Sequence, residues 1–146
     1  MSKAHGYGVH KWPNGDTYEG EWKMCLKHGR GTDTFHNGES YTGDFKNGKP
    51  HGKGKYLWGN GAVYSGDFDN GLKHGKGKWR SARIGGKISH YEGEYAHDLK
   101  HGWGYFAWAS GNTYQGQYFE DERMGFGKMI WTDGSSYEGQ WEHGIQ

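Results

Sequence analysis

Histidines recur at a nearly fixed interval, and a row of imidazoles is a pattern that can do chemistry because imidazole nitrogen is a common zinc ligand. Five of them are separated by 23, 23, 23 and 27 residues: His5, His28, His51, His74 and His101. If each belongs to one repeat of a sheet, equivalent histidines lie two strands apart, roughly 9.6 Å at the usual spacing. That distance is too long for a compact site within one chain. The pattern favours hydrogen-bonded loop histidines over a metal site, with zinc bridging two chains as the open alternative.

A cysteine nucleophile and a phosphate-binding loop are the other candidate chemistries. Cys25 lies close to His28, but a thiolate nucleophile also needs an oriented base, an oxyanion site and a pocket. The runs Gly52-Lys53-Gly54-Lys55 and Gly75-Lys76-Gly77-Lys78 fall in expected strands, whereas a phosphate-binding loop opens a helix. The sequence therefore predicts no catalytic residue and no cofactor, and thus no enzyme.

Composition narrows the class of protein further. The 146 residues include 29 glycines, 32% hydrophobic and 17% aromatic residues, with a mean hydropathy of -1.14. Aliphatic side chains are too few for a two-layer core, and rings are too many for a disordered chain, so aromatic residues must carry the packing. A net charge of +1 gives no reason to expect nucleic-acid binding.

We expect no membrane span, signal peptide or myristoylation. The sequence contains no run of 18 apolar residues, its first residues Met1–Gly6 include no apolar signal segment, and Ser2 replaces the glycine needed for myristoylation. One cysteine suits a reducing compartment. We therefore expect a cytoplasmic protein.

The elements that position these residues come from an internal repeat. The motif Tyr18–Trp22 returns at intervals of 23, 23, 27, 23 and 23 residues, in Tyr41–Phe45, Tyr64–Phe68, Tyr91–Tyr95, Tyr114–Tyr118 and Tyr137–Trp141. The repeats are 18–40, 41–63, 64–90, 91–113 and 114–136, flanked by half repeats 5–17 and 137–146. Such units are stabilised by stacking on their neighbours, so one array is expected. Its unpaired end strands suggest either a fragment of a longer repeat protein or head-to-tail filaments.

Each repeat predicts a β-hairpin. Counting from its tyrosine, polar and apolar residues alternate at positions 1 to 6, and positions 11 to 18 form the partner strand. We expect a four-residue loop at positions 7 to 10 and a three-residue loop at 19 to 21, closed by pairs such as Asn37-Gly38. These loops place position 16 opposite 1, 14 opposite 3 and 12 opposite 5, and put the tryptophans of position 18 on the tyrosine face. The fold class is all-β, an elongated single-layer antiparallel β-meander of about a dozen strands.

The motif Tyr18–Trp22, followed by Lys27–Gly31 and Asn37-Gly38, closely resembles the MORN (membrane occupation and recognition nexus) repeat over essentially residues 5–144. The resemblance implies a noncatalytic scaffold in a cytoskeletal, ciliary or membrane-associated assembly. Some family members bind peptides in a groove, some dimerise through C-terminal repeats, and phosphoinositide binding is proposed for others. Departures here are Met124, in place of the histidine before glycine, and the longer third repeat.

The tyrosine face carries a row of glycines flanked by rings. We expect rings to cover the bare glycine backbone, so that this face is the core. The alternative is an open trough that cradles a partner helix or an extended peptide.

The opposite face predicts a ladder of alternating charge that ends abruptly. Glu21 is expected to pair with Arg30, and across the repeat boundary Arg30 with Asp44; the next repeats continue the pattern. Cations and carboxylates then disappear together in the C-terminal third, as a surface that loses its water requires. We expect a partner-binding or self-association site there, made of Trp103, Tyr105, Gln115, Gln117, Phe126 and Ile130.

The four extra residues of the third repeat fall in the basic segment 80–87. An insertion in a surface loop costs little, so tolerance is the default. The alternative function is a peripheral module for phosphoinositides or other anionic lipids, with binding residues Lys76, Lys78, Arg80, Arg83 and Lys87.

Overall fold

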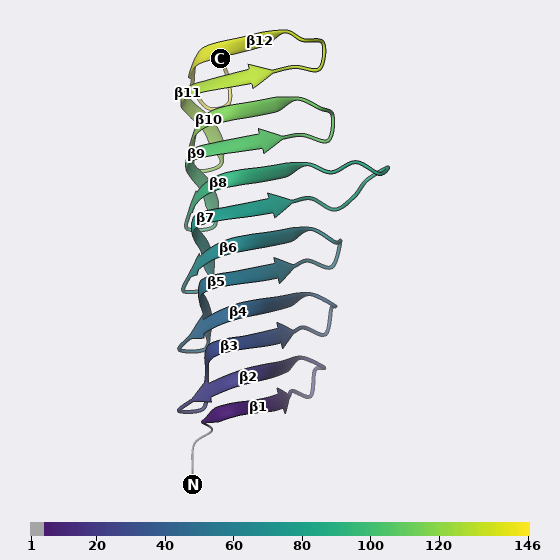
Figure 1. Ribbon diagram of the computed structural model, residues 1–146, viewed down its shortest axis with the longest axis vertical. Coiled ribbons are helices and arrows are strands. Elements are labelled where there is room, and N and C mark those ends of the chain that lie inside the picture. Colours follow the sequence, from purple (N-terminus) through teal and green to yellow (C-terminus); the bar gives the residue numbers. More distant parts are fainter. Residues whose placement is uncertain (1–4) are drawn as a thin grey trace.

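The computed structural model describes residues 5–146 as one open antiparallel sheet in which each strand pairs with the next along the chain (Figure 1). Residues 1–4, on which part of the targeting expectation rests, lie outside the described residues. None of the described residues forms a helix long and apolar enough to cross a membrane. The strands are β1 (Gly6–Lys11), β2 (Thr17–Lys23), β3 (Leu26–Thr34), β4 (Ser40–Lys46), β5 (Lys49–Leu57), β6 (Val63–Asp69), β7 (Leu72–Arg80), β8 (His90–Ala96), β9 (Leu99–Ala107), β10 (Thr113–Phe119), β11 (Glu122–Ile130) and β12 (Ser136–Trp141).

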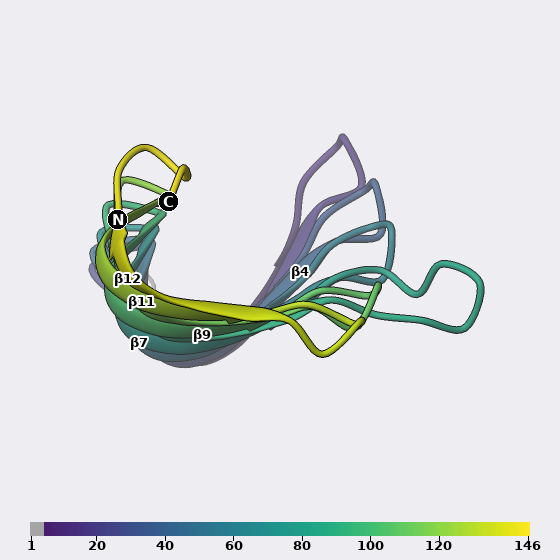
Figure 2. The same ribbon diagram turned by 90° about the horizontal axis from the view of Figure 1, so that it is seen from above.

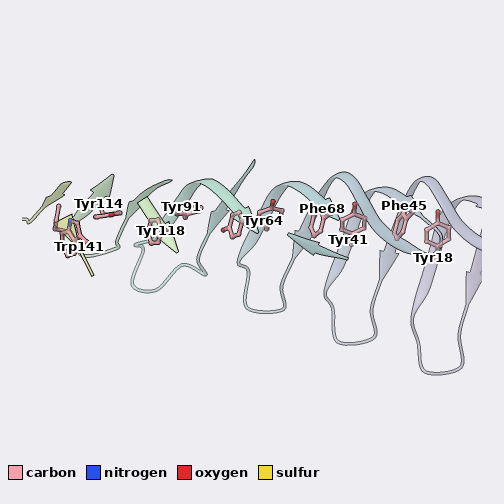
Figure 3. Close-up of a cluster of buried hydrophobic side chains, with 11 residues drawn as sticks. Tyr18, Tyr41, Phe45, Tyr64, Phe68, Tyr91, Tyr114, Tyr118 and Trp141 are labelled. Atoms are coloured by element: carbon pink, nitrogen blue, oxygen red, sulfur yellow. The ribbon is translucent and has the colours of Figure 1, made fainter. Parts of the chain in front are cut away.

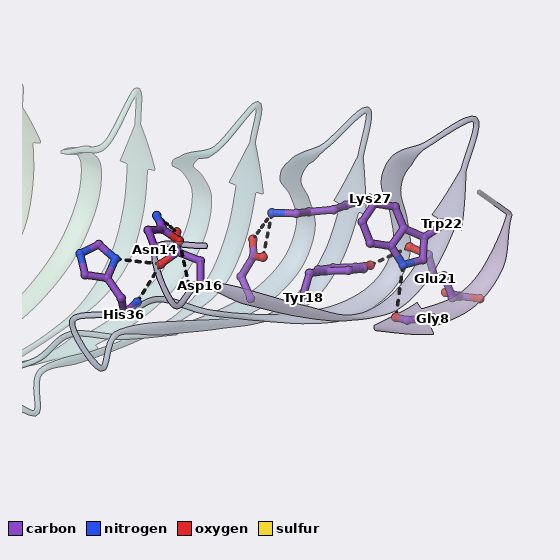
Figure 4. A network of polar contacts seen from close by, with 9 residues as sticks. Gly8, Asn14, Asp16, Tyr18, Glu21, Trp22, Lys27 and His36 are labelled. Atoms are coloured by element: carbon purple, nitrogen blue, oxygen red, sulfur yellow. Dashed lines mark hydrogen bonds and ion pairs between the residues drawn. The ribbon is translucent and has the colours of Figure 1, made fainter. Parts of the chain in front are cut away.

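The sheet is a single elongated layer bent into a trough. Viewed along its long axis, the edge with the short turns curls up in every repeat, whereas the edge with the longer loops rises in the N-terminal repeats and lies nearly level in the C-terminal ones (Figure 2). Tyr18 lies on the concave side of the sheet (Figure 4), and the other buried tyrosines belong to the same cluster. We call this side the inner face and the convex side the outer face. The predicted all-β meander is confirmed.

The loops between repeats follow the prediction. The N–H of Phe35 donates to the Glu39 carbonyl at 2.8 Å, which leaves three residues in the loop, and Gly38 adopts a φ of 89°. Trp12, Trp58, Trp108 and Trp131 make the same closing bond in their own loops. Across the boundary Asp33 pairs with Tyr41, Gly31 with Gly43 and Gly29 with Phe45, as the position rules require.

The loops inside repeats are shorter than predicted. Lys23 pairs directly with Leu26, so the turn has two residues, Met24 and Cys25, with φ values of 54° and 65°. The predicted four-residue loop and the pairing of position 12 with 5 inside a repeat are therefore wrong, because Trp22 faces Lys27. A bulge absorbs the difference: pairing jumps from Gly20–Gly31 to Trp22–Lys27, and the right-handed strand twist favours such two-residue turns.

A side chain at position 4 secures each bulge. Asp44 Oδ2 accepts the backbone N–H of Lys53 at 3.2 Å, and Asp67 Oδ2 accepts that of Lys76 at 3.0 Å. The equivalent bonds in the other repeats join Glu21 to Arg30, Glu94 to Trp103 and Gln117 to Phe126. Each bond satisfies a backbone donor that the bulge removes from the ladder.

Tyrosine rings cover the glycines on the inner face, as predicted. Figure 3 shows the buried rings in a row along the sheet. Tyr41 is 1% exposed, its hydroxyl donates to the Asp44 carbonyl at 2.8 Å, and a Cβ on Gly54 would overlap its ring. The position-5 rings pack edge-on against these tyrosines; Phe45 contacts both Tyr18 and Tyr41, with centroids 5.2 and 5.0 Å away. The core is thus a continuous row of rings that links every repeat to the next.

Candidate protein-binding surfaces

The apolar residues predicted as a binding site lie together on the outer face of β9–β11. Trp103 faces Gln117 on β10, and Tyr105 faces Gln115. Trp103 is 52% exposed, Tyr105 38%, Phe126 44% and Ile130 43%. The structure therefore brings the six predicted residues into one surface, which we call the outer patch and define as Trp103, Tyr105, Gln115, Gln117, Phe126 and Ile130.

Glutamine at position 4 keeps the sheet intact while it removes a charge. Gln117 Oε1 accepts the N–H of Phe126 at 2.7 Å, which is the bond that a carboxylate makes in the other four repeats. Gln115 lies between Tyr105 and Lys128 in register. The outer patch thus lacks carboxylates at positions where the backbone still needs an acceptor.

Ion pairs form at the first two of the three predicted steps of the charge ladder between repeats, and at the third Lys76 faces Glu94 in register. Arg30 Nη1 lies 3.2 Å from Asp44 Oδ1, and Lys53 pairs with Asp67. Within a repeat the prediction was incomplete, because Glu21 binds the Arg30 backbone N–H through the bulge. Burial raises the pKa of Asp67, but hydrogen bonds from Lys53 and the Lys76 N–H outweigh it and hold that pKa below its ordinary value.

The predicted lipid-binding residues fall into two groups. Lys76, Lys78 and Arg80 alternate along β7 on the outer face, where Lys78 Nζ is 3.8 Å from Glu92 Oε1. Arg83 and Lys87 instead belong to the hairpin between β7 and β8, which projects beyond the other loops (Figures 1 and 2).

That projecting hairpin has its own short ladder and turn. Ile84 and Lys87 form a bridge around Gly85 and Gly86, and Arg83 Nη1 donates to the Gly86 carbonyl at 3.1 Å. Ile84, at this tip, is 78% exposed. The insertion is therefore an ordered extension of a hairpin.

A shallow hollow on the outer face joins the basic strand to the outer patch. Its volume is about 580 Å³, and it is lined by Lys76, Lys78, Glu92, Glu94, Trp103 and three small residues. Two lysines and two glutamates make its walls close to neutral. The hollow therefore offers little net attraction for an anion by itself.

The inner face contains a feature that the sequence reasoning missed. Lys27 Nζ lies 5.1 Å from the Trp12 ring centroid, 5.4 Å from that of Tyr18 and 5.9 Å from that of Phe45. Figure 4 shows Lys27 on the same side of the sheet as Tyr18. The Lys27 ammonium also pairs with Asp33 Oδ1 at 2.7 Å. Burial raises the pKa of Asp33, and Lys27 opposes that rise.

The same cation position recurs in other repeats. Lys73, Lys100 and Arg123, each at position 10, lie over three rings at 4.9 to 5.9 Å, whereas Pro50 occupies this position in the second repeat. Burial lowers the pKa of Lys73. The sequence pattern that could have predicted these cations over rings is a lysine or arginine at position 10 in four of the five repeats.

Half-buried rings remain on the inner face beside this core. They are Trp12, Trp22, Tyr56, Trp58, Trp79, Phe106, Trp108, Trp131 and Tyr137. Their exposed parts line the inner face beside the buried row of tyrosines. This is the surface available for the predicted helix or extended peptide.

Two of the recurring histidines accept hydrogen bonds, as predicted, but the predicted loop position is wrong for His28, His51, His74 and His101, which lie in strands because the turns before them have only two residues. His5 Nδ1 accepts the Met24 N–H at 3.4 Å, and His74 Nδ1 accepts the His97 N–H at 3.3 Å. No group of three potential metal ligands occurs within residues 5–146. Cys25 is exposed in its turn, whereas His28 belongs to β3. Zinc bridging two chains stays a prediction.

Comparison with known proteins identifies the repeat. A family model described as the MORN repeat matches residues 1–17, 18–40, 41–63, 64–82, 91–113, 114–136 and 137–146. A comparison with curated protein sequences found no match. Among solved structures, the TCP domain of SAS-4 (dCPAP) in complex with a proline-rich motif of Ana2 (dSTIL) of Drosophila melanogaster is similar over 97% of this chain and 88% of that chain. Its sequence identity is 12% and its TM-score 0.35; a similarity of that size says nothing about what this chain binds.

Proposed function

The chain belongs to the MORN-repeat family, and we propose that it is a nonenzymatic scaffold that binds protein through its repeated sheet. Its setting would be a cytoplasmic assembly associated with the cytoskeleton, a cilium or a membrane. The partner is a second copy of the chain, another protein that contributes a helix or an extended peptide, or both.

The outer patch is the observation that carries this proposal. Trp103 and Phe126 project from alternate strands with about half of each side chain exposed, and Gln115 and Gln117 replace the acids that neighbouring repeats place between such positions. Exposed aromatic residues separated by uncharged side chains are typical of the centre of a protein interface. The half-buried rings of the inner face support a second protein-binding surface.

The test combines light scattering with capture of partner protein. Trp103→Ser with Phe126→Ser should lower the mass of the particle or abolish capture. The matched control is Tyr7→Ser, because Tyr7 is also at position 13 and is 71% exposed, but lies on β1. An unchanged result in both assays with the double variant would overturn the proposal.

The second candidate function is binding of anionic phospholipid. The supporting observation is the row Lys76, Lys78 and Arg80 on β7, next to a projecting hairpin that carries Arg83 and Lys87. Vesicles with and without phosphoinositide should separate the two functions by sedimentation. Binding that survives Lys78→Gln with Arg80→Gln would exclude the β7 row as the lipid site.

A further inference from the structure

The outer patch is symmetric about β10. In register, Trp103 and Phe126 lie on either side of Gln117, Tyr105 and Lys128 on either side of Gln115, and Ala107 and Ile130 on either side of Thr113. β9 and β11 run in the same direction because each is antiparallel to β10. A two-fold rotation about an axis along β10 therefore lays β9 of one copy onto β11 of another without a shift along the strands.

We propose, building on the protein-binding function above, that two copies of this chain pack outer face to outer face about that axis. Trp103 then meets Phe126 of the second copy, Tyr105 meets Lys128, and Ala107 meets Ile130, each contact occurring twice. These contacts are an aromatic pair, a cation over a ring and an aliphatic pair. All of them suit an interface that excludes water.

Each residue on the two-fold axis meets the same residue of the second copy. Its charge therefore decides whether the two copies can pack together. Gln115 and Gln117 can pair with themselves because an amide is both donor and acceptor. The fifth repeat is the only one of the five whose positions 2 and 4 both hold glutamine; Glu19, Glu21, Asp44, Asp67, Glu92 and Glu94 supply at least one carboxylate in each of the others. A carboxylate facing its own copy would repel it.

Equivalent axes along other strands bring like charges together. An axis along β6 sets Asp67 against itself and Lys53 against Lys76, and an axis along β8 sets Glu94 against itself. Electrostatic repulsion rejects such registers. The pattern of charges thus selects β10 among these equivalent strands.

At the rim of the interface two carboxylates face each other, and each has a lysine beside it that offsets the repulsion. Glu92 faces Glu138 of the second copy, but Lys78 is 3.8 Å from Glu92 and Lys128 is the register partner of Glu138. Strands β1–β7 of each copy extend away in opposite directions. Both inner faces and both basic β7 rows therefore stay open for other ligands.

Chemical cross-linking at the axis tests the register. The variant Gln115→Cys is made with Cys25→Gly, since Gly48 and Gly71 occupy the equivalent turn position. A short bismaleimide should join two such chains about 100-fold faster than it joins Thr42→Cys chains, because pairing raises the effective thiol concentration to the millimolar range. Thr42 is the matched control: it holds the same repeat position on β4, about 29 Å from the axis at the usual strand spacing.

Charge reversal gives an independent test. Ala107→Glu or Ile130→Lys alone should lower the particle from twice the 16.6 kDa chain mass to one chain, and the two together should restore the dimer through paired charges between copies. A monomer at every concentration, or equal cross-linking at positions 115 and 42, overturns the proposal. If the chain is monomeric but Trp103→Ser with Phe126→Ser abolishes capture of another protein, the scaffold function stands and the dimer does not. If the mass falls in the double serine variant but position 115 does not cross-link, self-association survives and this register fails.

Discussion

Lys27 Nζ and Asp33 Oδ1 are 2.7 Å apart, and the same Lys27 Nζ lies within 6 Å of three ring centroids. The side chain of Asp33 is 9% exposed and that of Lys27 20%. The second repeat replaces both partners, with Pro50 at the position of Lys27 and Tyr56 at that of Asp33. The second repeat therefore fills the same two positions without an ion pair, and its combination can be transferred to the first repeat.

Breaking this ion pair from one side should be costly. Lys27→Met leaves the Asp33 carboxylate buried without a counter-charge and should lower the free energy of unfolding by about 3 kcal/mol. Lys27→Pro with Asp33→Tyr, the combination of the second repeat, should recover most of that loss. Urea denaturation followed by tryptophan fluorescence measures both; a double variant no more stable than Lys27→Met would contradict the exchange.

The tyrosine that covers each glycine pair leaves no space for a methyl group. Gly54→Ala places a Cβ inside the Tyr41 ring and should destabilise the sheet by about 3 kcal/mol, because the ring cannot move without exposing the core. Gly59→Ala is the matched control, since its Cβ would make only ordinary contacts at 3.6 Å or more. Thermal unfolding by circular dichroism compares the two; equal midpoints would show that the ring yields.

The bulge bond requires an acceptor, not a charge. Asp67→Ala removes the acceptor of the Lys76 N–H and should cost about 1 to 2 kcal/mol. Asp67→Asn should cost less, because Gln117 already makes this bond with an amide oxygen. Hydrogen exchange at the Lys76 amide reports the bond directly, and protection unchanged in Asp67→Ala would contradict its role.

Buried tyrosines should set the alkaline limit of stability. Burial, reinforced by nearby carboxylates, raises the pKa of Tyr18 and Tyr56 to about 12 and raises those of Tyr41, Tyr64 and Tyr91 further. A pKa raised on folding contributes stability that is complete below the unfolded value of about 10 and is lost as pH rises toward the folded value.

The free energy of unfolding should therefore fall between pH 10 and about 12. Denaturant titrations at successive pH values measure the fall, and phenolate absorbance records ionisation in the same samples. If the buried tyrosines ionised fully while the sheet remained intact, burial would not be the cause of their raised pKa.

The outer patch shows how far a binding site can be predicted from the register of the repeats. Trp103, Phe126 and the two glutamines were placed on one surface by counting positions, because pairing between repeats follows the simple rule that glycine faces glycine. The symmetry about β10 follows from the same count, because position 13 is expected opposite position 4 both inside a repeat and across its boundary. In the structure this symmetry is kept by the bulge, which leaves Gln117 beside Phe126 although the two-residue turn shifts the pairs beyond it.

The sequence by itself determined the array, the strand order, the two faces and the change of character in the C-terminal third. A fixed repeat length forces equivalent residues into equivalent places, so one correctly assigned repeat assigns the rest. Only the tertiary structure decided the two-residue turns, the bulge secured by position 4, and the cations over the rings. These depend on sheet twist and curvature, which bring Lys27 back over Tyr18 and Phe45 of different hairpins, and a linear pattern of alternating residues contains no measure of that curvature.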